Sequence, residues 1–253
     1  MTRLIFVFVL ALVSCTAGPA ATGAATAAAT RPTTAAPTLF VTTSTPTAAP
    51  PTAAPAFRYV AIGASDTVGV GASDPRSGSW PARVAARLPA GIDYVNLGVS
   101  GSLASQAMRE QVPTALSLRP ELVTIWLAVN DLNANVSAAD YSAALRSVLA
   151  PLVSGTAARI FVGDVPDLRS VPAYAGTDQS ALFARITAYN AAITAIAATF
   201  PGRVSVVDLF TGSAPLVSTI TVSADGFHPS DAGYALIADR FLKGIADAGI
   251  ALR

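Results

Sequence analysis

Short apolar runs recur through the second part of the chain and alternate with amphipathic stretches. Five runs are rich in Val and Ile and lack strict apolar–polar alternation, which is typical of strands buried on both faces. They occupy residues 57–63, 92–98, 122–129, 158–165 and 203–210. Helical patterns lie between them at residues 79–88, 103–118, 137–153 and 178–200. Ser230 or Asp231 can cap a last helix. One face of that helix carries Tyr234, Ile237, Phe241 and Ile245.

This alternation of strands and helices predicts an α/β fold. We expect a three-layer α/β/α sandwich around a central five-stranded parallel sheet, flavodoxin-like, with right-handed crossovers. In such sheets ligands bind outside the carboxyl ends of the strands. The first three strands are followed by "GASDTVG", "NLGVSGS" and "VNDL", and "DGFHPSD" lies between the fifth strand and the last helix. Serine, glycine, asparagine and an Asp/His pair are therefore expected at one edge of the sheet.

The beginning of the chain has a different pattern. Arg3 precedes an apolar run over residues 4–13, which is shorter than the roughly 20 residues that span a bilayer. This pattern is typical of a secretory signal peptide. Residues 12–15, "LVSC", resemble the lipobox of bacterial lipoproteins. That resemblance implies a signal peptide over residues 1–14 and a lipidated Cys15 that anchors the mature protein to the outer face of a bacterial membrane. The alternative is an ordinary signal peptide with an incidental cysteine.

Residues 15–56 consist almost entirely of Ala, Thr, Pro and Gly. Such a segment cannot bury enough apolar surface to offset the entropy lost on ordering, so we predict a disordered tether that starts at Cys15. The remaining residues, 57–253, are long enough for one domain with a full core.

Charge and composition narrow the classes of function. The chain has 16 Lys and Arg against 15 Asp and Glu, and this balance gives no indication of a nucleic-acid partner. With one Cys and one His, a single chain cannot form a disulfide or a Cys/His zinc site. A carboxylate cation site stays open, although no stretch has the spacing of a calcium loop. We expect no metal and no cofactor, and no oligomeric state is predicted.

His228 is the only histidine, and Asp225 precedes it by three residues. A lone histidine is more often a surface or packed residue, but this pair could also be the acid and base of a catalytic set. Such a base needs a nucleophile. "GASD" occurs at residues 63–66 and again at 71–74. Only Ser65 directly follows a strand, where the next helix can direct N–H groups at an oxyanion. Ser73 lies eight residues further along in a glycine-rich loop, so Ser65 is the predicted nucleophile.

These stretches together resemble the SGNH hydrolases, the GDSL-type esterases and lipases. Gly63-Ala64-Ser65-Asp66 stands where the family has Gly-Asp-Ser-Leu, and "NLGVSG" supplies the second-block glycine as Gly101. Ala128-Val129-Asn130-Asp131 stands for Gly-x-Asn-Asp, and Asp225, His228 and Pro229 complete Asp-x-x-His-Pro. Ala64, Asp66 and Ala128 depart from the pattern, and Ala128 is expected to shift the loop of Asn130 slightly.

The resemblance implies an SGNH/GDSL-type carboxylic ester hydrolase that works through an acyl-enzyme without a cofactor. Ser65 would be the nucleophile, His228 the base, and Asp225 the acid that orients it. The N–H groups of Ser65 and Gly101 and the amide of Asn130 would form the oxyanion hole. We expect small-molecule or glycan esters with short acyl groups, since no long apolar lid is evident. The alternatives are an O-deacetylase or acyltransferase that acts on cell-envelope glycans, and a catalytically silent tethered binding module.

Overall fold

A parallel five-stranded sheet organises residues 57–253, the part of the chain that the computed structural model describes. The strands are β1 (Arg58–Gly63), β2 (Asp93–Asn96), β3 (Leu122–Trp126), β4 (Arg159–Gly163) and β5 (Val204–Val207). They are hydrogen-bonded in the order β2-β1-β3-β4-β5, which is the flavodoxin-like order. The predicted sheet is confirmed. The predicted signal peptide, Cys15 and the tether lie outside the described residues.

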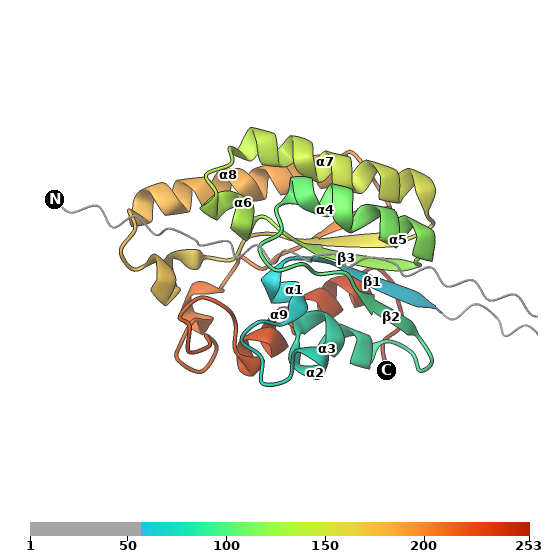
Figure 1. Ribbon diagram of the computed structural model, residues 1–253, viewed down its shortest axis with the longest axis horizontal. Coiled ribbons are helices and arrows are strands. Elements are labelled where there is room, and N and C mark those ends of the chain that lie inside the picture. Colours follow the sequence, from blue (N-terminus) through green and yellow to red (C-terminus); the bar gives the residue numbers. More distant parts are fainter. Residues whose placement is uncertain (1–56) are drawn as a thin grey trace, which may run out of the picture. The chain divides into compact units, whose positions relative to one another are not determined.

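Helices cover both faces of the sheet, as Figure 1 shows. One face carries α4 (Ala104–Glu110), α5 (Val112–Leu118), α7 (Ala138–Gly155) and α8 (Gln179–Ala198). The other face carries α2 (Pro75–Gly78), α3 (Trp80–Arg87) and α9 (Asp231–Asp247). The short helices α1 (Ser65–Val68) and α6 (Val129–Asn133) begin just beyond β1 and β3. Three 3-10 turns, η1 (Leu168–Ser170), η2 (Pro172–Tyr174) and η3 (Ala214–Leu216), complete the edge at which the strands end.

Each face of the sheet has its own buried core, which explains why the strands do not alternate between apolar and polar residues. On one face the rings of Tyr141 and Tyr189 stack at 4.8 Å. On the other the rings of Trp80 and Phe241 stack at 4.2 Å. Helix α8 is apolar enough to cross a membrane by length and composition. However, it buries Tyr189 in the core and packs against α7 and β5, so in this fold it is a core helix.

The helical stretch expected at residues 103–118 is two helices, because α4 ends before Gln111 and α5 starts after it. Pro113 occupies the first turn of α5, where its missing N–H does no harm, whereas within one continuous helix it would remove a hydrogen bond. At the other end of the domain, Ser230 caps α9 by accepting a hydrogen bond from the Gly233 N–H at 3.3 Å.

Candidate active site

Ser65 lies at the point where the chain leaves β1 and begins α1. Its side chain and backbone together are only 7% exposed. The backbone oxygen of Ala64 accepts hydrogen bonds from the N–H groups of Thr67 and Val68, both at 3.0 Å, and so closes the turn. Within residues 57–253, no acceptor takes up the N–H of Ser65 itself. The turn therefore presents a hydroxyl and an open N–H at the carboxyl edge of the sheet.

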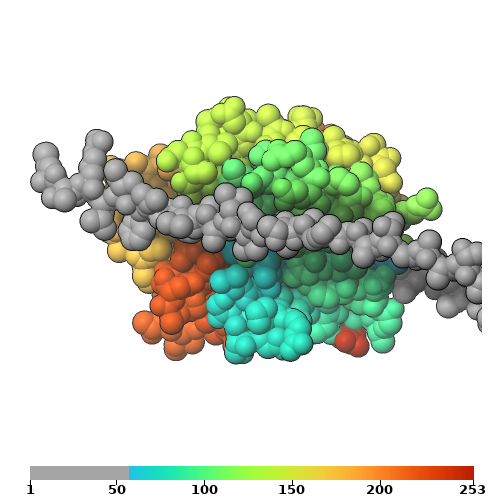
Figure 2. All heavy atoms as spheres, viewed as in Figure 1, coloured from blue at the N-terminus to red at the C-terminus, as the bar shows by residue number. Residues whose placement is uncertain are grey.

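Asp225 and His228 lie in a small hairpin between β5 and α9. An antiparallel bridge pairs Val222 with Pro229, and the Ser223 N–H donates to the backbone oxygen of His228 at 2.8 Å. Gly226 turns the chain with a φ of 73°, a conformation that glycine adopts without strain. In Figure 2 this segment, in orange, lies beside the segment that follows β1, in cyan. The fold thus brings the hairpin to the serine.

The carboxylate of Asp225 accepts four hydrogen bonds from within the hairpin. The donors are the imidazole Nδ1 of His228 at 2.6 Å, the N–H groups of Phe227 at 2.9 Å and His228 at 3.0 Å, and the hydroxyl of Ser223 at 2.8 Å. Burial by itself would raise the pKa of Asp225, but these hydrogen bonds outweigh it and hold the pKa below its usual range. Asp225 is therefore ionised at neutral pH.

His228 connects this carboxylate to the serine. Its Nδ1 lies 2.6 Å from Asp225 Oδ2, and its Nε2 lies 2.9 Å from Ser65 Oγ. Because an ionised carboxylate can only accept, Nδ1 carries the proton and the lone pair of Nε2 faces the serine hydroxyl. The side chain is 16% exposed, so solvent still reaches the site. This arrangement can take a proton from Ser65 and return it.

Gly101 lies in the loop between β2 and α4, and Asn130 lies in α6, just beyond β3. Gly101 has a φ of 79°, and among residues 57–253 no acceptor takes up its N–H. One amide hydrogen of Asn130 donates to the backbone oxygen of Ser102 at 3.2 Å, and no acceptor within residues 57–253 takes up the other. Ala128, in the family's glycine position, has a φ of 84° and a ψ of −43°. Glycine takes up this conformation readily, whereas it strains alanine.

Gln111 connects the turn before Ser65 to the loop that contains Gly101. The whole residue is only 1% exposed. Its Oε1 accepts from the Gly63 N–H at 2.9 Å, and its Nε2 donates to the Gly63 oxygen at 3.0 Å and to Ser102 Oγ at 3.2 Å. Gly63 precedes Ser65 by two residues and Ser102 follows Gly101, so one buried amide sets the distance between the two loops. Gln111 and Ser102 belong to no motif, and no pattern in the sequence indicated a role for either.

Asp131, in α6, is buried against the start of α4. Its carboxylate oxygens lie 3.0 and 3.3 Å from the backbone nitrogen of Ala104, which donates to them. Burial raises the pKa of Asp131, and the hydrogen bond from Ala104 partly offsets the effect. Asp131 thus connects α6 to α4, while its neighbour Asn130 turns to Ser102.

The structure also places Ser73, the serine of the second "GASD" stretch, and Asp66, which departs from the family pattern. The backbone N–H of Ser73 faces the carboxylate of Asp231 at 3.2 and 3.3 Å, so the structure brings Ser65, and not Ser73, to His228. Asp66 is half-buried and lines a cavity, where burial raises its pKa to about 6.

The described residues form no cluster that could hold a metal ion. Within residues 57–253, no group of three or more His, Cys, Asp or Glu side chains comes together as it would around a metal ion.

The arrangement matches a known family and several known structures. Residues 61–236 match the GDSL-like Lipase/Acylhydrolase family. Similar structures include a lipase/acylhydrolase from Enterococcus faecalis, which is 20% identical with a TM-score of 0.56 over 78% of this chain and 97% of that one.

Two other similar structures are esterases. A catalytic mutant of an acetylxylan esterase from Geobacillus stearothermophilus is 21% identical, with a TM-score of 0.60 over 74% of this chain and 93% of that one. A psychrotrophic esterase from Pseudoalteromonas is 17% identical, with a TM-score of 0.58 over 76% of this chain and 97% of that one. No curated protein sequence matches significantly. At these identities the structures establish the fold, and the family match extends over both the serine and the histidine.

Proposed function

The chain belongs to the GDSL-like lipase/acylhydrolase family and is a carboxylic ester hydrolase, and from this premise we propose that it cleaves short-chain esters through an acyl-enzyme on Ser65. The observation that carries this proposal is the contact of His228 with both partners, at 2.9 Å to Ser65 Oγ and 2.6 Å to Asp225 Oδ2. A catalytically silent binding module would have no need of this geometry.

In the first half of the reaction Ser65 Oγ attacks the ester carbonyl while His228 Nε2 takes its proton. The same proton then passes to the leaving alcohol, and the acyl group stays on Ser65. In the second half a water molecule gives its proton to His228 and attacks the acyl-enzyme, which releases the acid and restores the serine. Asp225 keeps the proton on Nδ1 and stabilises the imidazolium that forms in each half.

The negative charge on the carbonyl oxygen needs donors that are already in place. The N–H groups of Ser65 and Gly101 and the free amide hydrogen of Asn130 are the proposed donors. The two backbone N–H groups have no other acceptor within residues 57–253, and Asn130 is held by the Ser102 oxygen. Such fixed donors stabilise the transition state without reorganisation during the reaction.

Short acyl groups are the proposed substrates because the cavity beside Asp66 has a volume of only about 120 Å³. A panel of p-nitrophenyl esters from acetyl to palmitoyl tests this directly, with the Ser65→Ala protein as the background. We expect kcat/KM to be highest for acyl chains of about two to six carbons, consistent with the small volume. A maximum at palmitoyl would overturn the short-chain part, and no turnover of any ester would overturn the esterase proposal.

Removal of O-acetyl groups from glycans is a second candidate. It is favoured by the similarity to the acetylxylan esterase, which has the same fold over 74% of this chain. Acetylated xylan and O-acetylated peptidoglycan, tested beside the p-nitrophenyl panel, separate the two possibilities. Release of acetate from a polymer, with little activity on p-nitrophenyl butyrate, would favour the glycan substrate. An acyltransferase would instead pass the acyl group from Ser65 to an added alcohol.

We also propose that Cys15 carries a lipid that anchors the enzyme to the outer face of a bacterial membrane. The support is the sequence "LVSC" at residues 12–15 after a short apolar run. Metabolic labelling with a fatty-acid analogue should mark the wild-type protein and leave the Cys15→Ala protein unmarked. A Cys15→Ala protein that still incorporates the label and fractionates with membranes would contradict the anchor.

A further inference from the structure

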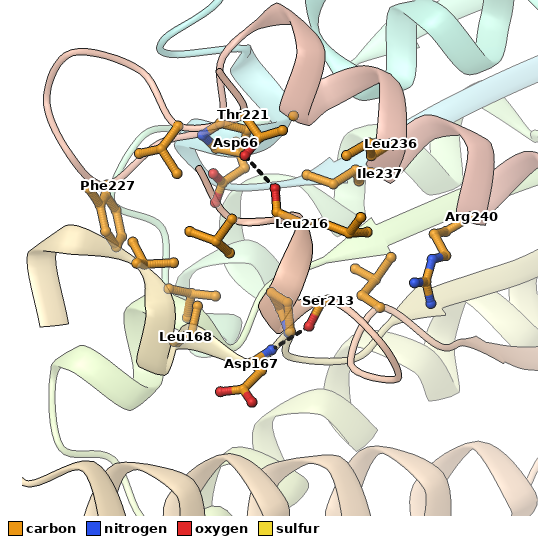
Figure 3. Close-up of a pocket in the computed structure, with 18 of the residues that line it drawn as sticks. Asp66, Asp167, Leu168, Ser213, Leu216, Thr221, Phe227, Leu236, Ile237 and Arg240 are labelled. Carbon is orange, nitrogen blue, oxygen red and sulfur yellow. Dashed lines mark hydrogen bonds between the residues drawn. The ribbon is translucent and has the colours of Figure 1, made fainter. Parts of the chain in front are cut away.

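A cavity of about 120 Å³ opens next to the catalytic hairpin. Most of its wall is apolar, and Figure 3 shows it between the hairpin, the turn around η3 and the start of α9. Asp66 follows Ser65 directly, while Phe227 and Pro229, which flank His228, also line it. Since consecutive Cα atoms are about 3.8 Å apart, the cavity begins one residue away from both the nucleophile and the base.

Five of the six polar side chains in the wall already have partners within the chain. They are Trp126, Asp167, Ser213, Thr221 and Arg240. Asp66 is the exception, because within residues 57–253 the only donor to its carboxylate is its own backbone N–H. In Figure 3 Asp66 and Arg240 lie at opposite sides of the cavity. Arg240 donates to the backbone oxygens of Asp208 and Thr211 and does not pair with Asp66.

Charged and titratable groups surround Asp66 without neutralising it. His228 lowers the pKa of Asp66 and Asp225 raises it, but burial is the largest effect and brings the pKa to about 6. Burial raises the pKa of Tyr174 and of Tyr234, and the charge of Asp66 raises both further, so their phenols are neutral. At pH 7 to 8 an ionised carboxylate therefore faces an apolar cavity. A carboxylate in such a place is stabilised by a cation that enters the cavity.

We propose that Asp66 and this cavity form a specificity site for esters that carry an ammonium group on a short apolar chain. The carboxylate would meet the ammonium group, and the aliphatic wall and the rings of Trp126 and Phe227 would meet its carbon atoms. The inference rests on the proposed esterase function for its substrates, although the site itself can be tested without hydrolysis. An engineered cavity of about 150 Å³ binds benzene, so a head group of about five or six heavy atoms suits this volume.

The departure from the family's sequence supports the same reading. The family pattern has leucine after the nucleophile, and this chain has Asp66 there. Leucine would complete an apolar wall, whereas aspartate adds a charge that no cation within residues 57–253 contacts. The residue is therefore better explained by what enters the cavity than by packing.

A binding experiment tests the site in Ser65→Ala protein, which cannot form an acyl-enzyme. Choline and 3,3-dimethylbutan-1-ol have the same shape and differ in the charged nitrogen. The chain has two tryptophans, and Trp126 lines the cavity whereas Trp80 does not. Choline should shift the indole N–H resonance of Trp126 more than that of Trp80. Its dissociation constant should rise at least tenfold in Asp66→Asn and Asp66→Leu proteins, while that of the neutral alcohol should stay equal or fall in the leucine variant.

The pH dependence of choline binding follows from the same carboxylate. Because the pKa of Asp66 is about 6, its ionised fraction falls roughly tenfold between pH 7.5 and pH 5. Choline should lose affinity by about that factor, and the neutral alcohol should not. Asp239 is an exposed carboxylate on α9, so Asp239→Asn serves as the matched control for net charge and should leave choline binding unchanged. Equal binding of both probes to the wild-type cavity, or no shift of Trp126, would overturn the site.

A kinetic experiment then tests the substrate class with two isosteric pairs. Acetylcholine is compared with 3,3-dimethylbutyl acetate, and p-nitrophenyl 4-(trimethylammonio)butanoate with p-nitrophenyl 5,5-dimethylhexanoate. In at least one pair, the ratio of kcat/KM for the charged to the neutral ester should fall at least tenfold in Asp66→Asn and Asp66→Leu. Ratios that stay unchanged in both variants would contradict the substrate class. Choline binding without turnover of any ester would instead contradict the esterase function and leave the binding site intact.

Discussion

The two sides of the active site are held in place by different means. On the serine side, Ser65, Gly101 and Asn130 depend on hydrogen bonds between distant residues, such as the two buried ones between Gln111 and Gly63, which lies 48 positions earlier. On the histidine side, Asp225 and His228 depend on hydrogen bonds inside one short hairpin, where the partners are two or three residues apart.

This difference predicts how each side of the active site responds to substitutions. A buried amide that loses its partner leaves an unsatisfied group, which costs about 1–3 kcal/mol, so the serine side is strongly constrained by the tertiary fold. An exposed carboxylate with several local donors loses little when one is removed. We therefore expect the serine side to respond sharply to distant substitutions and the histidine side to respond mainly to changes within the hairpin.

The largest effect is expected where Ser65 and His228 act together in catalysis. Ser65→Ala and His228→Ala should each lower kcat/KM by roughly 10⁴-fold or more, because either change stops formation of the acyl-enzyme. The double variant should be no worse than the single ones. Steady-state rates on p-nitrophenyl butyrate measure this, with Ser73→Ala as the control that keeps its activity. A further large loss in the double variant would mean that the two sides contribute independently.

The next effect concerns the oxyanion donor on the serine side. Asn130→Ala should lower kcat by roughly 10²–10³, a loss of about 2.7–4 kcal/mol, with KM little changed. Asn130→Asp should be at least as damaging, since it replaces a donor by a charge that repels the oxyanion. Melting curves show whether both variants are folded. Near-normal kcat in two folded variants would mean that Asn130 serves only the turn.

Asp66 follows Ser65 in α1, where the charges of His228 and Asp225 reach it, and it should make stability depend on pH. Its pKa is about 6 in the folded protein, raised by burial above its ordinary value of 3.8. The folded state therefore holds this proton more tightly, and the associated stability is complete below pH 4 and is lost as the pH rises through 6. Asp66→Asn does not titrate, so its advantage in unfolding free energy should grow from pH 4 to pH 8, by up to about 3 kcal/mol.

Urea unfolding at each pH measures this difference, and Asp239→Asn provides the control because it removes an exposed carboxylate of the same type. A difference between Asp66→Asn and wild type that stays constant from pH 4 to pH 8 would show that burial does not perturb Asp66.

Gln111 and Ser223 form the most direct comparison of the two sides. Gln111→Ala removes three hydrogen bonds to Gly63 and Ser102 and should lower the unfolding free energy by about 2 kcal/mol and kcat by roughly tenfold. Ser223→Ala removes one of four hydrogen bonds to Asp225 and should change stability by less than about 0.5 kcal/mol. Equal effects of the two substitutions on folded protein would remove the distinction between the sides.

The last test concerns the backbone at Ala128. Its φ of 84° strains alanine, so Ala128→Gly should stabilise the protein by about 1 kcal/mol, even after the greater entropy of glycine in the unfolded chain is counted. That gain corresponds to a rise in Tm of about 2–4 °C. Ala64 is a matched control because its φ is −114°, and Ala64→Gly should lower Tm. If both substitutions lower Tm, the backbone at Ala128 is not strained.

The sequence by itself determined the sheet, most of the helices that cover it, and the place of the Asp225–His228 stretch between the fifth strand and the last helix. The strands are apolar throughout because both faces of a parallel sheet are buried, and that pattern is visible in the order of residues. The pair Asp225 and His228 was also visible, since the bonds that hold it link residues within one short segment. The break at Gln111 was missed because the apolar pattern continues across it, although Pro113 signals the end of a helix just before it.

Only the tertiary structure decided how the serine side is built and what lies beside it. Gln111 and Gly63 meet because α4 and α5 fold back over the end of β1, and no local pattern indicates a contact over 48 positions. The significance of Asp66 depends in the same way on its surroundings, since its pKa is set by the burial and the charges that the fold gathers around it. Contacts between neighbours in sequence leave a pattern that can be read, whereas contacts between distant residues exist only once the strands have been ordered.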